Sequence, residues 1–139
     1  MIKFKSMRFQ LLIIVLTLFC SNAVGQKSST VKCEFDFGSM TEGEITLIQL
    51  LSDSLRFHCA DSSYNFVIGG FGLTTKCDGV TRYFKNEKDG SLTPEMKANV
   101  RTLKPGCLIE FSNVYPRPLN TRRSYGYYST KERLKFWLK

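Results

Sequence analysis

His58, the only histidine of the chain, stands directly before Cys59, and a base beside a thiol is what nucleophilic catalysis by cysteine requires. Neighbouring residues of a strand point to opposite faces, so these two side chains are expected to diverge. Acidic pairs such as Glu34 with Asp36 share a face, but no third catalytic group accompanies them. The sequence therefore predicts no catalytic residue, no cofactor and no enzymatic activity.

The cysteines lack the spacing that metal binding or thiol redox chemistry needs. No two of them form a Cys-x-x-Cys pair, and His58 is the only histidine, so a zinc site or a redox motif lacks its usual spacing. An even number of cysteines in an exported chain indicates disulfides, and four remain once the expected export signal is removed: Cys33, Cys59, Cys77 and Cys107. Four cysteines allow three pairings, and spacing alone does not choose among them. The four cysteines fall on the inward side of their expected strands. This shared side, together with proximity in sequence, favours the pairs Cys33 with Cys59 and Cys77 with Cys107.

A binding surface is expected in the segment from Tyr115 to Lys131, because tyrosine and arginine are enriched at the hot spots of protein interfaces. The tyrosines and arginines in question are Tyr115, Arg117, Arg122, Arg123, Tyr125, Tyr127 and Tyr128. The same composition suits single-stranded nucleic acid, which an exported protein seldom meets. A polar loop between two strands is the other interpretation. We therefore expect a protein partner, with a carbohydrate or an anion as the alternative ligand and no nucleic acid.

The first 25 residues predict the compartment. Three cations, Lys3, Lys5 and Arg8, precede the apolar run Leu11–Phe19, and small residues follow up to Gly25. This order is typical of a secretory signal peptide over residues 1–25, which leaves 26–139 as a single exported domain. The run is about half of the roughly 20 residues that a bilayer span needs, so no transmembrane anchor is expected in the mature chain. A membrane anchor and a lipoprotein signal lipidated at Cys20 are the weaker alternatives.

Alternating apolar residues indicate strands. Every second residue from Val31 to Phe37 is apolar, and the ranges 55–59 and 64–68 repeat this pattern. After Ile68 the apolar face resumes at Phe71, three residues later instead of two. Such a slip predicts a β-bulge at Gly69 and Gly70, because an extra residue restores the facing.

Helical signals are clear in one place. Thr93 can cap a helix, Pro94 suits its first position, and Gly106 lies just beyond its end, which predicts a helix over about 94–103. The range 44–51 can form a short helix or a strand, and its periodicity does not decide. Strand patterns return at 107–111 and 134–138. Five to seven short strands with one inserted helix indicate a mainly β domain.

Several segments in this order resemble the carboxy-terminal domain of the gliding-motility protein GldM and its small exported relatives. The matching segments are 43–45, the central strand 66–73, 91–96 at the helix start, 103–106, 109–114 and the final strand 134–139. The resemblance implies an immunoglobulin-like β-sandwich of short antiparallel strands in the periplasm. It also implies a family that acts through protein contacts in gliding and type IX secretion, without catalytic residues. Relatives carry a Pro-Asp-Gly turn where this chain has 115–120, and a free-standing relative of the motor protein is expected.

Overall fold

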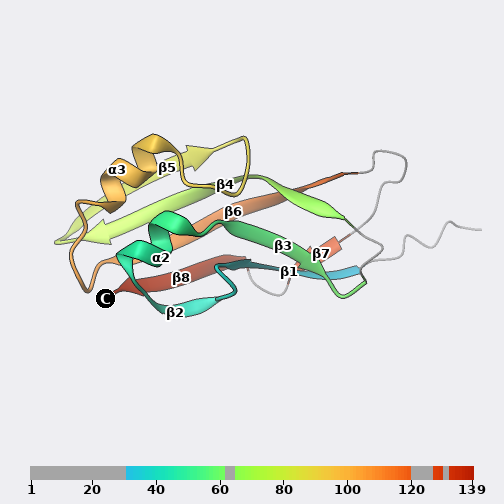
Figure 1. Ribbon diagram of the computed structural model, residues 1–139, viewed down its shortest axis with the longest axis horizontal. Coiled ribbons are helices and arrows are strands. Elements are labelled where there is room, and N and C mark those ends of the chain that lie inside the picture. Colours follow the sequence, from blue (N-terminus) through green and yellow to red (C-terminus); the bar gives the residue numbers. More distant parts are fainter. Residues whose placement is uncertain (1–30, 62–64, 120–126, 130–131) are drawn as a thin grey trace, which may run out of the picture.

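The computed structural model describes residues 31–61, 65–119, 127–129 and 132–139, and for 127–129 it describes the backbone alone. The expected signal peptide lies outside these residues, as do Arg122, Arg123 and Tyr125. The described part of the chain contains eight strands and two helices (Figure 1). In chain order they are β1 Val31–Phe37, β2 Glu42–Ile45, α2 Leu47–Ser52, β3 Leu55–Cys59, β4 Phe66–Cys77, β5 Val80–Asn86, α3 Pro94–Val100, β6 Leu108–Pro118, β7 Tyr127–Ser129 and β8 Arg133–Leu138.

The strands form two sheets. One has three strands in the order β3-β1-β7, and the other has five in the order β2-β8-β6-β4-β5. The expectation of a mainly β fold is thus confirmed. The expectation of antiparallel strands is wrong at two pairs, because β1 lies parallel to β7 and β2 lies parallel to β8. In each of these parallel pairs one strand, β7 or β2, is short and lies at the edge of its sheet.

A single apolar core fills the space between the two sheets. The alternation predicted for β1 places Phe35 and Phe37 in it, and Phe37 stacks on Phe111 of β6 with ring centroids 4.7 Å apart. The other members are Ile45, Leu50, Leu55, Ile68, Phe71, Leu73, Leu92, Met96, Val100, Ile109, Leu134, Phe136 and Leu138. These residues come from both sheets and both helices, so the described elements share one core.

The segment 44–51, left open by periodicity, ends β2 with its first two residues and is helical from Leu47 onward in α2, so the prediction of a single helix is wrong. The first turn of α2 is fixed by a capping box: the Gln49 amide N–H donates to the Thr46 hydroxyl at 3.2 Å, and the Thr46 amide donates to Gln49 Oε1 at 2.9 Å. Helix α3 begins at Pro94 as predicted but ends at Val100 instead of 103. After Val100 the amides of Thr102 and Leu103 donate to carbonyls three residues earlier, as in a 3₁₀ turn, and not four residues earlier as in an α-helix. Pro105 agrees with this early end, because a proline disfavours helical conformation in the residue before it.

Strand β6 runs on to Pro118, so the loop expected to begin at Tyr115 begins later. The first residues of β4 pair with this last part of β6: Val67 lies opposite Arg117, and Ile68 lies opposite Pro116. Strand β8 pairs with β6 only over 108–112, so β6 is an edge strand at its prolines. Proline lacks an amide N–H and is tolerated at such an edge. The two prolines that suggest a loop in the sequence therefore lie in a strand.

The register between β4 and β6 shifts on both sides of Gly70, which confirms the predicted bulge. A Cβ atom at Gly69 would lie 2.5 Å from Cε2 of Tyr115. A Cβ at Gly70 would lie 2.6 Å from Cε1 of the same ring and 2.5 Å from the carbonyl oxygen of Asn86. The bulge thus turns two successive glycines toward one tyrosine ring, and the absence of side chains lets the ring approach the backbone.

Both disulfides that facing and proximity favour are present. Cys33 of β1 is bonded to Cys59 of β3, its direct cross-strand neighbour. Cys77, at the end of β4, is bonded to Cys107, which directly precedes β6. Each bridge therefore joins neighbouring antiparallel strands of one sheet and not the two sheets to each other.

We expect the mature protein to contain no free thiol, because its four cysteines are paired. Thiol titration of the denatured but unreduced protein should find less than one free group per chain. Reduction should lower the free energy of unfolding by about 2 to 4 kcal/mol for each bridge. Two or more titrated thiols would contradict this expectation.

Gly69→Ala and Gly70→Ala should each destabilise the protein, by about 1 to 3 kcal/mol in chemical denaturation, because the new methyl group collides with Tyr115. In a Tyr115→Ala background the cost of Gly69→Ala should largely vanish, since its closest contacts are side chains. The cost of Gly70→Ala should persist, because the Asn86 carbonyl is backbone. If Tyr115→Ala reduced the loss of stability equally for Gly69→Ala and Gly70→Ala, the glycines would matter for another reason.

Candidate functional site

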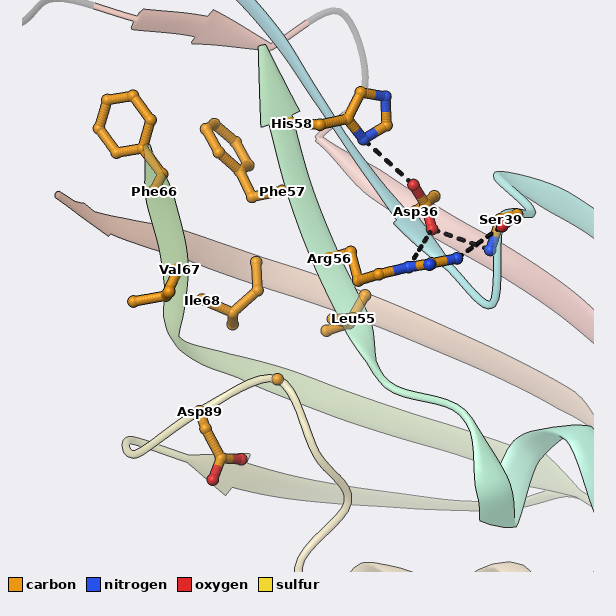
Figure 2. Close-up of a pocket in the computed structure, with 11 residues that line it drawn as sticks. Asp36, Ser39, Leu55, Arg56, Phe57, His58, Phe66, Val67, Ile68 and Asp89 are labelled. Atoms are coloured by element: carbon orange, nitrogen blue, oxygen red, sulfur yellow. Dashed lines mark hydrogen bonds and ion pairs between the residues drawn. The ribbon is translucent and has the colours of Figure 1, made fainter. Parts of the chain in front are cut away.

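A groove of about 530 Å³ lies beside β3, bordered by the start of β4 and by the loop after β5 (Figure 2). It has a polar side and an apolar side. The lining residues are Asp36, Ser39, Leu55, Arg56, Phe57, His58, Phe66, Val67, Ile68, Asp89 and Gly90.

The pairing of β1 with β3 assembles the polar side. In the antiparallel register Asp36 lies opposite Arg56, and Glu34 lies opposite His58. Because alternate residues of a strand share a face, Arg56 and His58 both lie beside Asp36 on the face away from the core. Figure 2 shows the two side chains converging on the carboxylate from β3.

Asp36 is the centre of this cluster. Its side chain is only 11% exposed, although the sequence pattern placed it on the solvent face of β1. One carboxylate oxygen, Oδ2, lies 3.2 Å from Nδ1 of His58, and the other, Oδ1, lies 3.4 Å from Nε of Arg56. A shielded carboxylate is stable only with such partners, because burial penalises an unpaired charge.

A tight turn after β1 supplies the third contact to Asp36. Phe37 and Met40 exchange two backbone hydrogen bonds of 2.8 and 3.0 Å around Gly38 and Ser39, which both have positive φ angles. This is the geometry of a two-residue hairpin turn. It aims the Ser39 amide N–H at Oδ1 of Asp36, 2.9 Å away, while the Ser39 hydroxyl accepts from Nη2 of Arg56 at 2.5 Å.

The apolar side is formed where β3 faces β4. The rings of Phe57 and Phe66 meet edge to face with centroids 5.5 Å apart, and Ile68 is buried below them. The Leu55 amide N–H donates to the Gly90 carbonyl at 2.8 Å, which ties the start of β3 to the loop after β5. The groove therefore has a fixed floor, although its two walls belong to different sheets.

The side chains of His58 and Cys59 have different partners. His58 turns Nδ1 toward Asp36, whereas Cys59 is bonded to Cys33, so the expected divergence of these neighbours is confirmed. Arg56 and Asp36 compensate each other's charge, which leaves hydrogen-bond donors beside an apolar wall. Among the described residues, no group of three or more His, Cys, Asp or Glu side chains is arranged to hold a metal ion.

The residues expected to bind a partner are spread over both sheets. Tyr115 and Arg117 lie on β6 in the five-stranded sheet and are exposed. The backbone of Tyr127 and Tyr128 lies in β7, paired with Val31 and Lys32 of the three-stranded sheet. Arg122, Arg123 and Tyr125 lie outside the described residues. Nothing in the described part of the chain brings these positions together as one surface.

The cluster around Asp36 was missed by the sequence analysis. Alternation alone placed Asp36 with Glu34 as a solvated charge, and it is the register of β1 against β3 that supplies its partners. One local signal was present, since Gly38-Ser39 directly after an alternating strand is typical of a hairpin turn. That turn predicts a polar acceptor close to its free amides, although not which one.

Comparison with known proteins finds no matching family model, no matching curated protein and no matching solved structure. None of the helices within the described ranges is long and apolar enough to cross a membrane.

Asp36→Ala should destabilise the protein by about 1 to 3 kcal/mol, because the Ser39 amide loses its acceptor and the side chains of Arg56 and His58 lose a partner. The larger part should come from the amide, since Arg56 and His58 are more than half exposed and water can solvate them. The matched control is Glu34→Ala on the same strand, whose ion pair with Lys32 is exposed and whose loss should cost no more than about 0.5 kcal/mol. Equal losses in urea denaturation would argue against a special role for Asp36.

Proposed function

We propose that this chain is an exported, non-enzymatic domain of the bacterial cell envelope that works by binding another protein. We further propose that it is similar in fold and role to the carboxy-terminal domain of GldM. The observation that carries the binding role is the groove beside β3, where a polar cluster centred on Asp36 adjoins the apolar wall of Phe57, Phe66 and Val67. Aromatic residues and arginine next to apolar surface are the composition of interface hot spots.

The strand order supports an immunoglobulin-like sandwich. In a variable-type immunoglobulin domain one sheet contains neighbouring strands G, F, C and C′. The order β8-β6-β4-β5 matches that arrangement, and β1 with β3 matches the first two strands of the opposite sheet. Helix α3 stands where strands C″, D and E of that domain would connect β5 to β6. Both disulfides lie within a sheet, unlike the bridge between sheets in antibody domains.

The export of the protein is supported by its chemistry. Both disulfides form only where the compartment is oxidising, as in the periplasm or outside the cell. The basic leader and apolar run at the start of the sequence agree with that location.

A carbohydrate- or anion-binding module is the second candidate function, favoured by Tyr115 and Arg117 on the exposed face of β6. Under this proposal the basic and aromatic segment 115–131 binds the ligand, whereas the groove beside β3 is structural. Mutations in the two regions therefore distinguish the two functions.

The first test is crosslinking of the full-length protein in its native envelope, followed by identification of the bound protein and measurement of its affinity for the purified mature domain. Val67→Asp, which places a charge against the apolar wall, should weaken that binding tenfold or more, about 1.4 kcal/mol. Val80→Asp on β5 is the matched control, because Val80 is 54% exposed and lies outside the groove. Its affinity should equal that of the unchanged protein.

The combined variant Arg122→Ala, Arg123→Ala, Tyr127→Ala tests the other surface in the same assay. A tenfold loss in this variant, with normal binding by Val67→Asp, would move the partner site to the 115–131 segment. Binding that falls steeply with added salt would indicate charge attraction instead of a packed interface. Retention on an anionic polysaccharide, with no protein captured, would replace the first function with the second.

A further inference from the structure

Three glycines on the outer face of β4 are buried, although this face of the five-stranded sheet points away from the core. They are Gly69, Gly70 and Gly72, and the residues that cover them are tyrosines from the two neighbouring strands. Tyr115 of β6 covers the first two, and the tip of Tyr83 of β5 covers the third. Because the glycines have no side chains, the two tyrosine side chains pack directly against the backbone of β4.

The contacts show how Tyr115 lies. Cε2 of its ring is 2.5 Å from the Cβ position of Gly69, whereas Cε1 and the hydroxyl are 2.6 and 2.7 Å from that of Gly70. Both edges of the ring therefore touch the strand, so the ring lies across it. The hydroxyl of Tyr83 comes within 2.7 Å of the Cβ position of Gly72, the next outward-facing residue. The two rings approach β4 from opposite sides and cover consecutive stretches of it.

Both rings keep one surface open to solvent. Tyr83 is 55% exposed and Tyr115 is 43% exposed, although each is packed against glycine backbone. Rings that stand upright make the walls of a groove, as in domains that bind proline-rich peptides. The ring of Tyr115, which lies across the strand, forms a platform together with the tip of Tyr83, and a platform suits a flat and partly apolar ligand.

The rim of the platform is polar, with an ion pair on β5 and the exposed Arg117 near Tyr115 on β6. Lys85, opposite Gly72 on β5, forms an ion pair with Glu87. The pKa of Lys85 is raised, first by its hydrogen bond with Glu87 and then by the charge of that carboxylate, with smaller contributions from Tyr83 and Tyr115. One ammonium group is thus close to both tyrosines and to the carboxylate. Ser112, opposite Gly72 on β6, places a hydroxyl-bearing residue on the other side.

We propose that the platform of Tyr83 and Tyr115 over the β4 glycines is a binding site for a carbohydrate chain. A sugar ring has a flat face of C–H groups that packs on an aromatic ring, and hydroxyl groups at its edge that both donate and accept hydrogen bonds. The Lys85–Glu87 pair offers a donor and an acceptor for such hydroxyl groups. This site goes beyond the proposed protein-binding function, shares Tyr115 with the second candidate function, and lies on a different sheet face from the groove.

The test uses the purified mature chain with its disulfides intact and calorimetric titration with hexamers of β-1,4-glucose, α-1,4-glucose, mannose and N-acetylglucosamine. At least one of these probes should bind with a Kd of about 1 mM or tighter. Tyr83→Ala and Lys85→Ala should each weaken that binding, the first by about tenfold and the second by about threefold. Trp137→Ala is the matched control, because Trp137 is 52% exposed on β8 of the same sheet and should not matter for binding.

Three results would overturn the proposal. They are the absence of binding by all four probes, binding unchanged by Tyr83→Ala and Lys85→Ala, or equal weakening by Trp137→Ala. Tyr115→Ala exposes glycine backbone and can unfold the sheet, so Tyr115→Phe, which keeps the ring, serves at that position and should retain binding. Tyr83→Ala should leave capture of the protein partner intact, whereas Val67→Asp should leave oligosaccharide binding intact. Failure of either proposal is therefore visible without the other.

Discussion

The stacking of Phe37 on Phe111 is the contact on which the arrangement of the two sheets depends. Phe37 comes from the centre strand of the small sheet and Phe111 from the centre strand of the large one. Phe71 and Phe136 surround Phe111 with centroids 5.6 and 6.1 Å away, so one ring contacts three others. Neither disulfide crosses between the sheets. Apolar packing of this kind must therefore hold the sheets together, and the bridges hold strand ends within each sheet.

Because Phe35 and Phe37 of β1 are buried in the core, the residues between them must lie on the opposite face of the strand. Asp36 lies between them and must point outward, where Arg56 and His58 of β3 meet it. The cluster is thus a consequence of strand alternation together with the register of β1 against β3, in which the Cys33–Cys59 disulfide joins two directly paired residues. A shift by one residue would exchange the faces and place the carboxylate in the core. The same packing that stabilises the sheets therefore also positions the polar side of the groove.

Much of this fold was predictable, because an apolar residue at every second position indicates a strand and shows which of its side chains point to the core. The residues of β1, the bulge at Gly69-Gly70, the start of α3 and the facing of the four cysteines all follow from local sequence. The helix α2 was ambiguous, because its apolar residues suit both periods and only the capping box of Thr46 with Gln49 decides. The extension of β6 through Pro116 and Pro118 was not predictable, since it depends on β8 beginning only opposite Ser112 and leaving β6 unpaired with β8 beyond that residue. Cross-strand partners such as Asp36 with Arg56 were beyond reach for the same reason: they depend on register, which is a tertiary property.

The glycines of β4 illustrate how one sequence feature serves two purposes. As a strand residue glycine is unfavourable, because it loses conformational entropy and offers no side chain to pack. Tyr83 and Tyr115 offset this loss by covering the bare backbone, as aromatic neighbours of strand glycines do. That structural role explains why the rings lie on the strand, yet it is satisfied by their lower surfaces alone. It does not explain the ion pair of Lys85 with Glu87 at the rim, because neither side chain is among the nearest contacts of the glycines. This ion pair is therefore the part of the arrangement that covering the glycines leaves unexplained and that ligand binding would use.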